Sequence, residues 1–245
     1  MWWWFRRKRR PAPAAPEATP GGSAVDRCGE SGSAKTAVAI AGAETAGFAG
    51  QRERIYEEFF GPSAQVFHEM SPRVPHIDVR QFGPGHAGRD FHTLVTSGMS
   101  DSAMSLPPGA ADATSRVELI LYCREPEQAH LETLRHLAHY PHDHHTWLGT
   151  GHTMPNGHPP EPIWGSPALD TFLFLPTILV PDMTLPDRLK LNGESVEFLW
   201  VVPISSAECD LKRKQGIDEL LDLFDRFEHP PIFDPNRACY VAAAR

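Results

Sequence analysis

The pattern of apolar and polar positions predicts alternating helices and strands from residue 51 onward. Residues 51–60 favour a helix, which ends at the strong breaker Gly61-Pro62. Strand-like runs follow at residues 76–82, 91–97 and 117–123. In the run at 117–123, apolar side chains occur at both odd and even positions, which point to opposite faces of a strand. We therefore expect both faces of that strand to be covered.

The second half of the chain continues this alternation. A helix is predicted to begin at Pro126, because Leu131, Leu134 and Ala138 then share one face. Residues 155–186 are rich in proline, so we expect an irregular stretch there, interrupted by a short apolar run at 171–175.

A central strand is predicted at residues 194–204, followed by two helices. Ser205 and Glu208 have the spacing of a capping box, which opens the first helix. The second follows Gly216 and carries an apolar stripe. The whole pattern is mixed α/β (α+β), and we predict one domain, residues 51–245, with a central mixed β-sheet flanked by helices.

The first fifty residues have a different composition. Ala, Pro, Gly, Ser and Thr dominate residues 11–50, and such a stretch cannot bury enough apolar surface to offset its ordering entropy. We therefore predict that residues 1–50 form a disordered extension.

That extension starts with Trp2-Trp3-Trp4-Phe5, and five basic residues, 6–10, follow. An export signal carries its charges before its apolar core, so this start does not predict export. Two interpretations stay open: an unstructured extension, which we favour, and a segment that rests on an anionic membrane surface. No apolar run of the chain is long enough to span a bilayer.

Charge is divided unevenly along the chain. Residues 1–50 have a net charge of +3, whereas residues 51–245 have a net charge of −11. An acidic domain repels phosphate backbones, which argues against nucleic-acid binding and suits a partner with a basic surface.

The spacing of the cysteines bears on the cellular compartment, and one glycine-rich segment bears on cofactor binding. Four cysteines lie far apart in the sequence, which predicts neither a zinc framework nor a secreted disulfide scaffold but a reducing cytoplasm. Residues 29–36 approximate a phosphate-binding loop, but Ala34 replaces its second glycine. We expect no cofactor and no small-molecule substrate.

Histidines are concentrated in one part of the chain. Eight of thirteen fall in one stretch: His130, His136, His139, His142, His144, His145, His152 and His158. Imidazole is the commonest metal ligand, so a metal-dependent hydrolase using His142, His144, His145 and His152 stays open as the alternative function. The order His142-Asp143-His144-His145 does not match a known hydrolase signature and no HExxH is present, so we favour structural roles and predict no functional metal.

Other catalytic groups are poorly supported. The segment Gly98-Met99-Ser100-Asp101-Ser102 lacks the closing glycine of a nucleophile elbow. Cys123 lies inside a predicted strand, where a buried apolar role is expected. The carboxylates of Asp78, Asp90, Asp101 and Glu118 could include a pair, but sequence does not place any two together. We predict that the chain is not an enzyme.

Segments in a particular order carry a resemblance to a known family. They are residues 76–79 (HIDV), 94–101 (LVTSGMSD), 118–119 (EL), the helix end at 134–141, 147–153 (WLGTGHT), 201–204 (VVPI) with Glu208, and 216–221 (GIDELL). In this order and spacing the chain resembles the Suppressor of fused family over about residues 51–240.

The resemblance implies a non-enzymatic α/β domain that binds another protein. Animal members hold Gli-type transcription factors, clasping an extended peptide as an added strand between two domains. This chain resembles the amino-terminal domain alone. Bacterial members are regarded as immunity proteins that neutralise toxins of polymorphic secretion systems. The Ala-, Arg- and Pro-rich composition favours this branch, and hence a cytoplasmic protein whose partner is a toxin with a basic surface.

The same resemblance suggests where a partner would bind. Ser97, Gly98, Ser100 and Asp101 match the family's Gly-hydrophobic-Ser-Asp segment, near which the animal proteins hold their peptide, and Trp147 belongs to a second matching segment. We take these five as candidate partner-binding residues. The alternative is that Gly98 and Asp101 only build a turn and that Trp147 is packed inside.

Overall fold

The computed structural model describes residues 33–110 and 113–244, and it describes side chains from residue 47 onward. Seven strands form one mixed sheet in the order β1-β2-β3-β4-β9-β6-β5, and β7 and β8 form a separate small ribbon. The strands are β1 (Ser63–Phe67), β2 (Asp78–Phe82), β3 (His92–Ser97), β4 (Val117–Cys123), β5 (Thr153–Pro155), β6 (Thr171–Pro176), β7 (Lys190–Leu191), β8 (Glu194–Ser195) and β9 (Glu197–Ile204).

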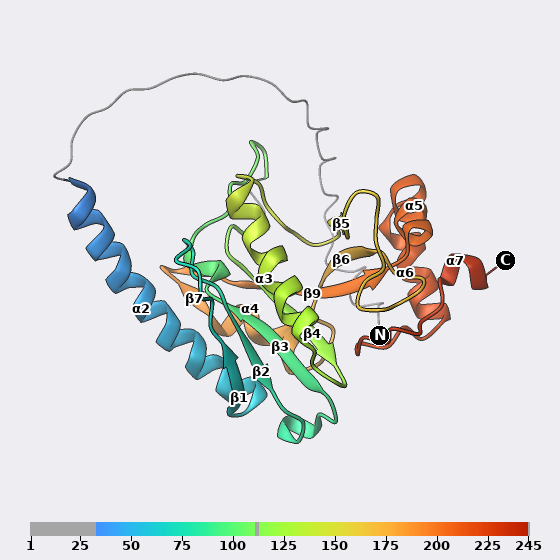
Figure 1. Ribbon diagram of the computed structural model, residues 1–245, viewed down its shortest axis with the longest axis horizontal. Coiled ribbons are helices and arrows are strands. Elements are labelled where there is room, and N and C mark those ends of the chain that lie inside the picture. The colour runs from blue at the N-terminus through green and yellow to red at the C-terminus, as the bar shows by residue number, and fades with distance from the viewer. Residues whose placement is uncertain (1–32, 111–112, 245) are drawn as a thin grey trace.

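Helices precede, interrupt and follow these strands (Figure 1). The α-helices are α2 (Ser33–Phe60), α3 (Gln128–Asp143), α4 (Leu185–Arg188), α5 (Ser206–Gln215), α6 (Ile217–Arg226) and α7 (Tyr240–Ala243). Short 3-10 turns occur at η1 (His86–Gly88), η2 (Met99–Asp101) and η3 (Asp182–Thr184). The mixed α+β class predicted from the sequence is confirmed.

The sheet is antiparallel except at its centre. β4 and β9 run parallel, with Ile120 opposite Trp200, and every other neighbouring pair in the sheet is antiparallel. This central pair is buried on both faces, because alternate residues of β4 enter two different apolar clusters. Leu119 packs with α3, whereas Ile120 packs with α2 and α6. The expectation that both faces of the 117–123 strand are covered is confirmed, and Trp200 lies in the core.

Helix α2 differs from the sequence prediction. It begins at Ser33, whereas we expected a helix only over 51–60 and disorder before it. Residues 33–50 contain no proline and many alanines, and alanine has the highest helix propensity, so the helix extends backward from the packed end. Phe48 is buried in the core although it precedes the predicted boundary. The division of the chain at residue 50 stays a prediction.

The predictions for residues 1–32 lie outside the described residues. This applies to the aromatic and basic start and to most of the segment at 29–36. Over residues 33–110 and 113–244, no helix is both long enough and apolar enough to cross a membrane.

The proline-rich stretch and the following strand fit the prediction with smaller differences. Residues 155–186 are mostly irregular around β6, and only η3 and the start of α4 add helical turns. The strand predicted at 194–204 begins at Glu197, because Glu194 and Ser195 turn away into the β7–β8 ribbon. Sequence analysis missed both edge strands, β1 and β5.

A buried ion pair joins α5 to the C-terminal segment. The predicted capping box is confirmed, since the Glu208 carboxylate accepts a 2.8 Å bond from the Ser205 amide. The same carboxylate accepts bonds from the Tyr240 amide and from the Arg237 guanidinium, 2.8 and 2.7 Å long. Arg237 also donates to the Pro203 carbonyl at 3.0 Å. One carboxylate thereby ties β9, α5 and α7 together.

Replacing Arg237 should therefore measure how much the Arg237–Glu208 pair contributes to the free energy of unfolding. Arg237→Ala leaves the fully buried Glu208 charge without its cation, and removing one member of a buried pair typically lowers the free energy of unfolding by about 3–5 kcal/mol. Urea denaturation measures this loss. The control is Arg213→Ala on the exposed surface of α5, which should change the same quantity by less than about 0.5 kcal/mol.

Candidate functional site

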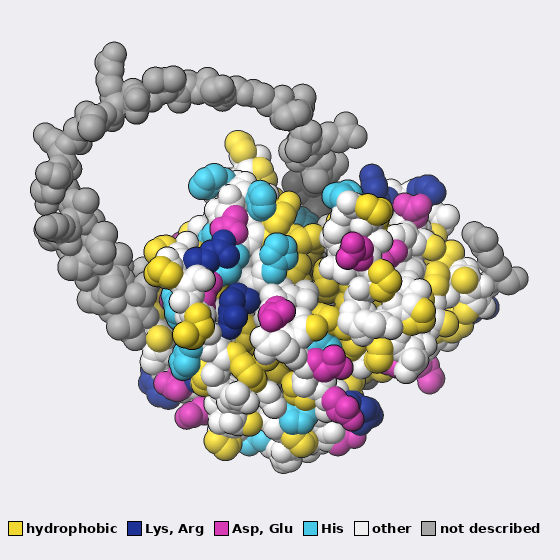
Figure 2. Space-filling view, in the orientation of Figure 1, with side chains coloured by type: hydrophobic (Ala, Val, Ile, Leu, Met, Phe, Trp, Pro, Cys, Tyr) yellow, Lys and Arg dark blue, Asp and Glu magenta, His cyan; other side chains and the backbone are white. Residues whose placement is uncertain are grey.

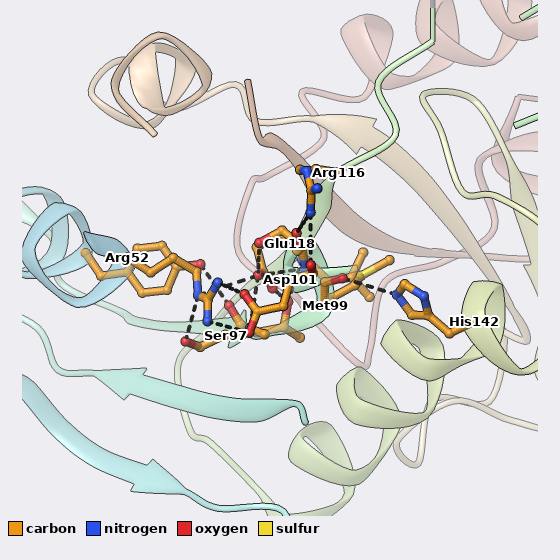
Figure 3. A network of polar contacts seen from close by, with 12 residues as sticks. Arg52, Ser97, Met99, Asp101, Arg116, Glu118 and His142 are labelled. Carbon is orange, nitrogen blue, oxygen red and sulfur yellow. Dashed lines mark hydrogen bonds and ion pairs between the residues drawn. The ribbon is translucent and has the colours of Figure 1, made fainter. Parts of the chain in front are cut away.

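The predicted segment at 97–101 surrounds a carboxylate on the central strand (Figure 3). Glu118 on β4 is fully buried, and its Oε1 accepts bonds from the Gly98 amide (3.0 Å), the Ser100 amide (3.1 Å) and the Ser100 hydroxyl (2.6 Å). Its Oε2 accepts a 2.6 Å bond from the Thr96 hydroxyl. The carboxylate thereby holds the end of β3 and the turn η2 against β4.

Arg52 of α2 reaches the same cluster from the other side. Its guanidinium pairs with the Asp101 carboxylate and lies 3.9 Å from Glu118, and its Nε donates to the Ser97 hydroxyl at 3.2 Å. The Arg52 side chain is 2% exposed. Figure 3 shows these side chains converging from α2, η2 and β4. Two of the four carboxylates that sequence could not place, Asp101 and Glu118, thus share one arginine.

Burial and Arg52 act in opposite directions on the pKa values of these two carboxyl groups. It raises the pKa of Glu118 above its ordinary value, and Arg52 and the hydroxyl donors partly offset this increase. Burial likewise raises the pKa of Asp101, again opposed by Arg52. The cation paired with Asp101, one of the candidate partner-binding residues, is therefore Arg52 of the same chain.

Gly98 is required by the turn geometry. Its φ of +124° is one that residues with side chains rarely adopt, and a Cβ at this position would lie 2.0 Å from the His76 carbonyl oxygen. The proposed structural role of Gly98 therefore has a direct geometric basis.

The turn η2 is also bonded to the C-terminal part of α3. His142 donates from Nε2 to the Met99 carbonyl at 3.1 Å, and Arg116 donates to the Ser100 and Asp101 carbonyls at 2.7 and 3.0 Å. Burial lowers the pKa of His142, which favours the neutral ring. The network around Glu118 thus fixes the position at which the chain leaves α3.

The segment after α3 carries the fifth candidate residue, Trp147. Its indole ring lies against His152, with ring centroids 4.3 Å apart, and a Cβ on Gly149 would come within 2.6 Å of it. Thr150 donates to the Glu197 carboxylate at 3.1 Å, and burial raises the pKa of that carboxyl. Trp147 is half-buried, so it is neither fully packed nor free.

This segment leads directly into the edge strand β5. The Phe174 amide donates to the His152 carbonyl at 3.0 Å, and the Asn156 amide donates to the Asp170 carbonyl at 2.8 Å. Because successive residues of a strand direct their backbone groups to opposite sides, the N–H and C=O of Thr153 point away from β6. Pro155 also faces outward but has no N–H.

A groove lies between this edge and α3. Its volume is about 250 Å³, and its apolar lining includes Leu137, Met154 and Phe172. Glu132 and His136 of α3 line it as well. Small-molecule sites typically have volumes of about 300–1,000 Å³, so the volume of this groove lies just below that range.

The histidines do not form a centre. His142 is bonded to Met99, His152 lies against Trp147, and His144 and His145 are exposed beyond the end of α3. Within residues 33–110 and 113–244, no three His, Cys, Asp or Glu side chains are arranged to hold a metal ion. Figure 2 shows histidine side chains spread over this face rather than gathered.

Other histidines have structural partners. His139 is buried and its Nε2 lies 2.8 Å from the Glu69 carboxylate. Nδ1 of His130 accepts a 3.0 Å bond from the Glu127 amide and so completes the N-terminal cap of α3. His136, three positions before His139 on the same helix, is instead exposed at the groove.

Candidate nucleophiles are likewise engaged or buried. The Ser100 hydroxyl donates to Glu118, and burial raises the pKa of the Cys123 thiol to about 12. The contributions of Arg52, Thr153 and Glu197 were missed from the sequence. Arg52 sits in an ordinary charged helix pattern, and β5 is too short to give a strand signal.

Comparisons with known proteins point to one family. The family model described as "Suppressor of fused protein (SUFU)" matches residues 73–238. A solved structure of a SUFU homolog from Neisseria gonorrhoeae FA 1090 is similar, with a TM-score of 0.61 and 20% identity over 80% of this chain and 97% of that chain. A chain of the Sufu-Fu complex crystal structure has a TM-score of 0.55 and 12% identity over 81% of this chain and 93% of that chain. At these identities the structural likeness concerns the fold alone. No curated protein matches.

Replacing Gly98 tests the turn around Glu118. Gly98→Ala should lower the free energy of unfolding by about 3 kcal/mol or more, because the new Cβ combines backbone strain with a clash against the His76 carbonyl. Gly83→Ala is the matched control, because a Cβ there meets nothing within 4 Å. Equal stability of the two variants in urea would contradict this account of the turn.

The buried His139 should make stability depend on pH. Burial lowers its pKa, and the Glu69 carboxylate partly offsets that decrease. The unfolded chain therefore binds the proton first, and this contribution to stability is lost as the pH falls below the ordinary histidine value of about 6.5. When the pH falls from about 7.5 to about 5.5, the free energy of unfolding should therefore decrease less in His139→Gln than in the wild type.

Urea titrations at several pH values measure this difference. His145→Gln changes an exposed histidine and controls for nonspecific effects. Parallel pH profiles for His139→Gln and wild type would show that protonation of His139 is not linked to unfolding.

Proposed function

We propose that this chain, which belongs to the Suppressor of fused family, is a non-catalytic domain that binds another protein by accepting an added strand at β5. The observation that carries this proposal is the outward-facing backbone of Thr153 at the sheet edge. Strand addition needs unpaired N–H and C=O groups on an edge and nearby pockets that select side chains. The groove between β5 and α3 is such a pocket.

Trp147 would contact the partner next to this edge. It lies against His152, the residue that precedes β5, and it is half-buried, so part of its ring is available. Aromatic residues of this kind often supply much of the binding energy at protein interfaces. For Ser97, Gly98, Ser100 and Asp101, contact with a partner stays a prediction, and their bonds within the chain support a positioning role.

The chemistry of the partner follows from charge. The net charge of −11 over residues 51–245 favours a partner with a basic surface, since opposite charges speed the encounter of two proteins. The Sufu-Fu complex is an assembly of a fold relative with another protein. We propose a cytoplasmic immunity protein that neutralises a basic toxin, with no role in catalysis.

The experiment takes as the candidate partner the product of a large secreted-toxin gene, sought among the neighbours of the gene for this chain. Thr153→Pro removes the outward N–H of the edge, whereas Thr153→Ser keeps both the N–H and the hydroxyl. Losing one hydrogen bond and leaving its partner carbonyl buried should weaken the Kd by about tenfold or more in Thr153→Pro, and Thr153→Ser should bind like wild type.

Calorimetry at constant salt measures both constants, and survival of cells that express the toxin provides the biological readout. Rescue by wild type and Thr153→Ser but not by Thr153→Pro is the expected result. Unchanged binding by Thr153→Pro would exclude strand addition at β5, and no binding by wild type would exclude this toxin as the partner.

A further inference from the structure

The edge strand β5 lies between two helices, α3 and α5 (Figure 1). The Cys209 thiol of α5 donates to the Thr153 hydroxyl, with a sulfur–oxygen distance of 3.7 Å, whereas the next residue, Met154, lines the groove beside α3. Successive side chains of a strand point to opposite faces of its sheet. A strand added at β5 follows the same alternation, because its residues lie opposite those of β5. Its side chains therefore face α5 and α3 in turn.

The α5 side of this edge is basic. Lys212, Arg213 and Lys214 lie in the last turn of α5, and Figure 2 shows Lys and Arg side chains over this helix. Lys212 is three positions after Cys209 and so shares its face of the helix. Burial lowers the pKa of His152, the residue before β5, and the Lys212 ammonium lowers it further. Lys212 is therefore close to the start of β5.

Lys212 also lacks a counter-charge within the domain. Nζ of Lys214 lies 3.7 Å from the Asp210 carboxylate, but among the side chains of residues 47–110 and 113–244 no carboxylate pairs with Lys212. Lys212 is half-buried, and burial lowers its pKa. Partial burial of an unpaired ammonium costs free energy, which a carboxylate placed next to it would offset.

The α3 side of the edge is apolar at its base. Leu137 of α3 and Phe172 of β6 line the groove together with Met154. In a pair of strands, side chains directly opposite each other are about 4.5–5.5 Å apart at Cβ. A residue opposite Met154 would therefore lie at this groove, where an apolar side chain loses its contact with water.

We propose that the strand accepted at β5 alternates acidic and apolar residues, with a carboxylate bound to Lys212 on the α5 face and an apolar side chain in the groove on the α3 face. The residue opposite Thr153 supplies the carboxylate, and the residue opposite Met154 supplies the apolar side chain. The inference rests on the proposed strand addition at β5 and adds the charge and spacing of the segment that is added.

This local preference differs in range from the effect of the net charge. The charge of −11 over residues 51–245 acts on the partner as a whole during the encounter. Lys212 acts on one side chain next to it, at a distance shorter than the screening length of about 8 Å at physiological salt. A partner with a basic surface is therefore compatible with an acidic residue in the strand that it adds.

Three synthetic peptides test the charge of the strand. Each has two leucines on either side of one central residue, which is aspartate, serine or lysine, and polar residues at both ends. NMR titration at about 0.15 M salt, followed at the amides of residues 150–157, measures each Kd. The aspartate peptide should bind about fivefold more tightly than the serine peptide, and the lysine peptide should bind most weakly. The net charge of the domain alone predicts the opposite order.

Charge reversal in the full chain identifies the cation. In Lys212→Glu the lysine peptide should bind more tightly than the aspartate peptide, which is a gain that an unfolded variant cannot produce. Lys190→Glu on the exposed part of β7 changes the net charge equally and should keep the wild-type order. Equal affinities of wild type for the aspartate and lysine peptides would overturn the inference. An order that Lys212→Glu leaves unchanged would overturn it as well.

Thr153→Pro separates this inference from the proposed function. If Thr153→Pro weakens all three peptides but wild type does not prefer aspartate, strand addition stands and the acidic residue is wrong. If Thr153→Pro leaves every affinity unchanged, or if no peptide binds wild type, strand addition at β5 and this inference both fail. Protection of the wild-type Thr153 amide from hydrogen exchange that rises with protein concentration would identify a second copy as the occupant and overturn the inference.

Discussion

The site depends on a single buried carboxylate, Glu118, on the central strand. A charged group in the core is tolerated only when its oxygens are fully bonded. Here the amides of Gly98 and Ser100 and the hydroxyls of Thr96 and Ser100 satisfy it, and Arg52 lies close by. Each donor that satisfies the charge is also a constraint on the segment that carries it. The turn η2 has its shape because it must present two amides and a hydroxyl to one point.

That constraint extends to the surface through α3. The turn offers the Met99 carbonyl to His142, and Leu148 just beyond the helix donates its amide to the Met104 sulfur at 3.4 Å. The position of Trp147 is therefore set from inside the domain. A segment that is already held by buried bonds has little conformational entropy left to lose if a ligand contacts it.

The sequence was informative where a pattern repeats and uninformative where a role depends on one contact. Periodicity located β4, α3, β9 and α6, because their apolar faces are long enough to show a period. Periodicity did not predict the edge strands. For β5 the reason is that the strand has only three residues and its outward face needs no apolar side chains. The matched family segments located η2, but Arg52 is separated from Asp101 by 49 positions, and no local pattern indicates such a contact. Ala-rich composition was also ambiguous, since it favours disorder in one context and the extended α2 in another.

Pro155 has a consequence for the behaviour of the protein at high concentration. An uncovered sheet edge is a template on which a second, identical edge can assemble, and repetition of that event produces aggregates. At β5 the strand offers one outward donor, at Thr153, and the proline two residues later offers none. Two copies therefore cannot join along a continuous ladder there. Pro155 is therefore a barrier to self-association through backbone pairing at this edge.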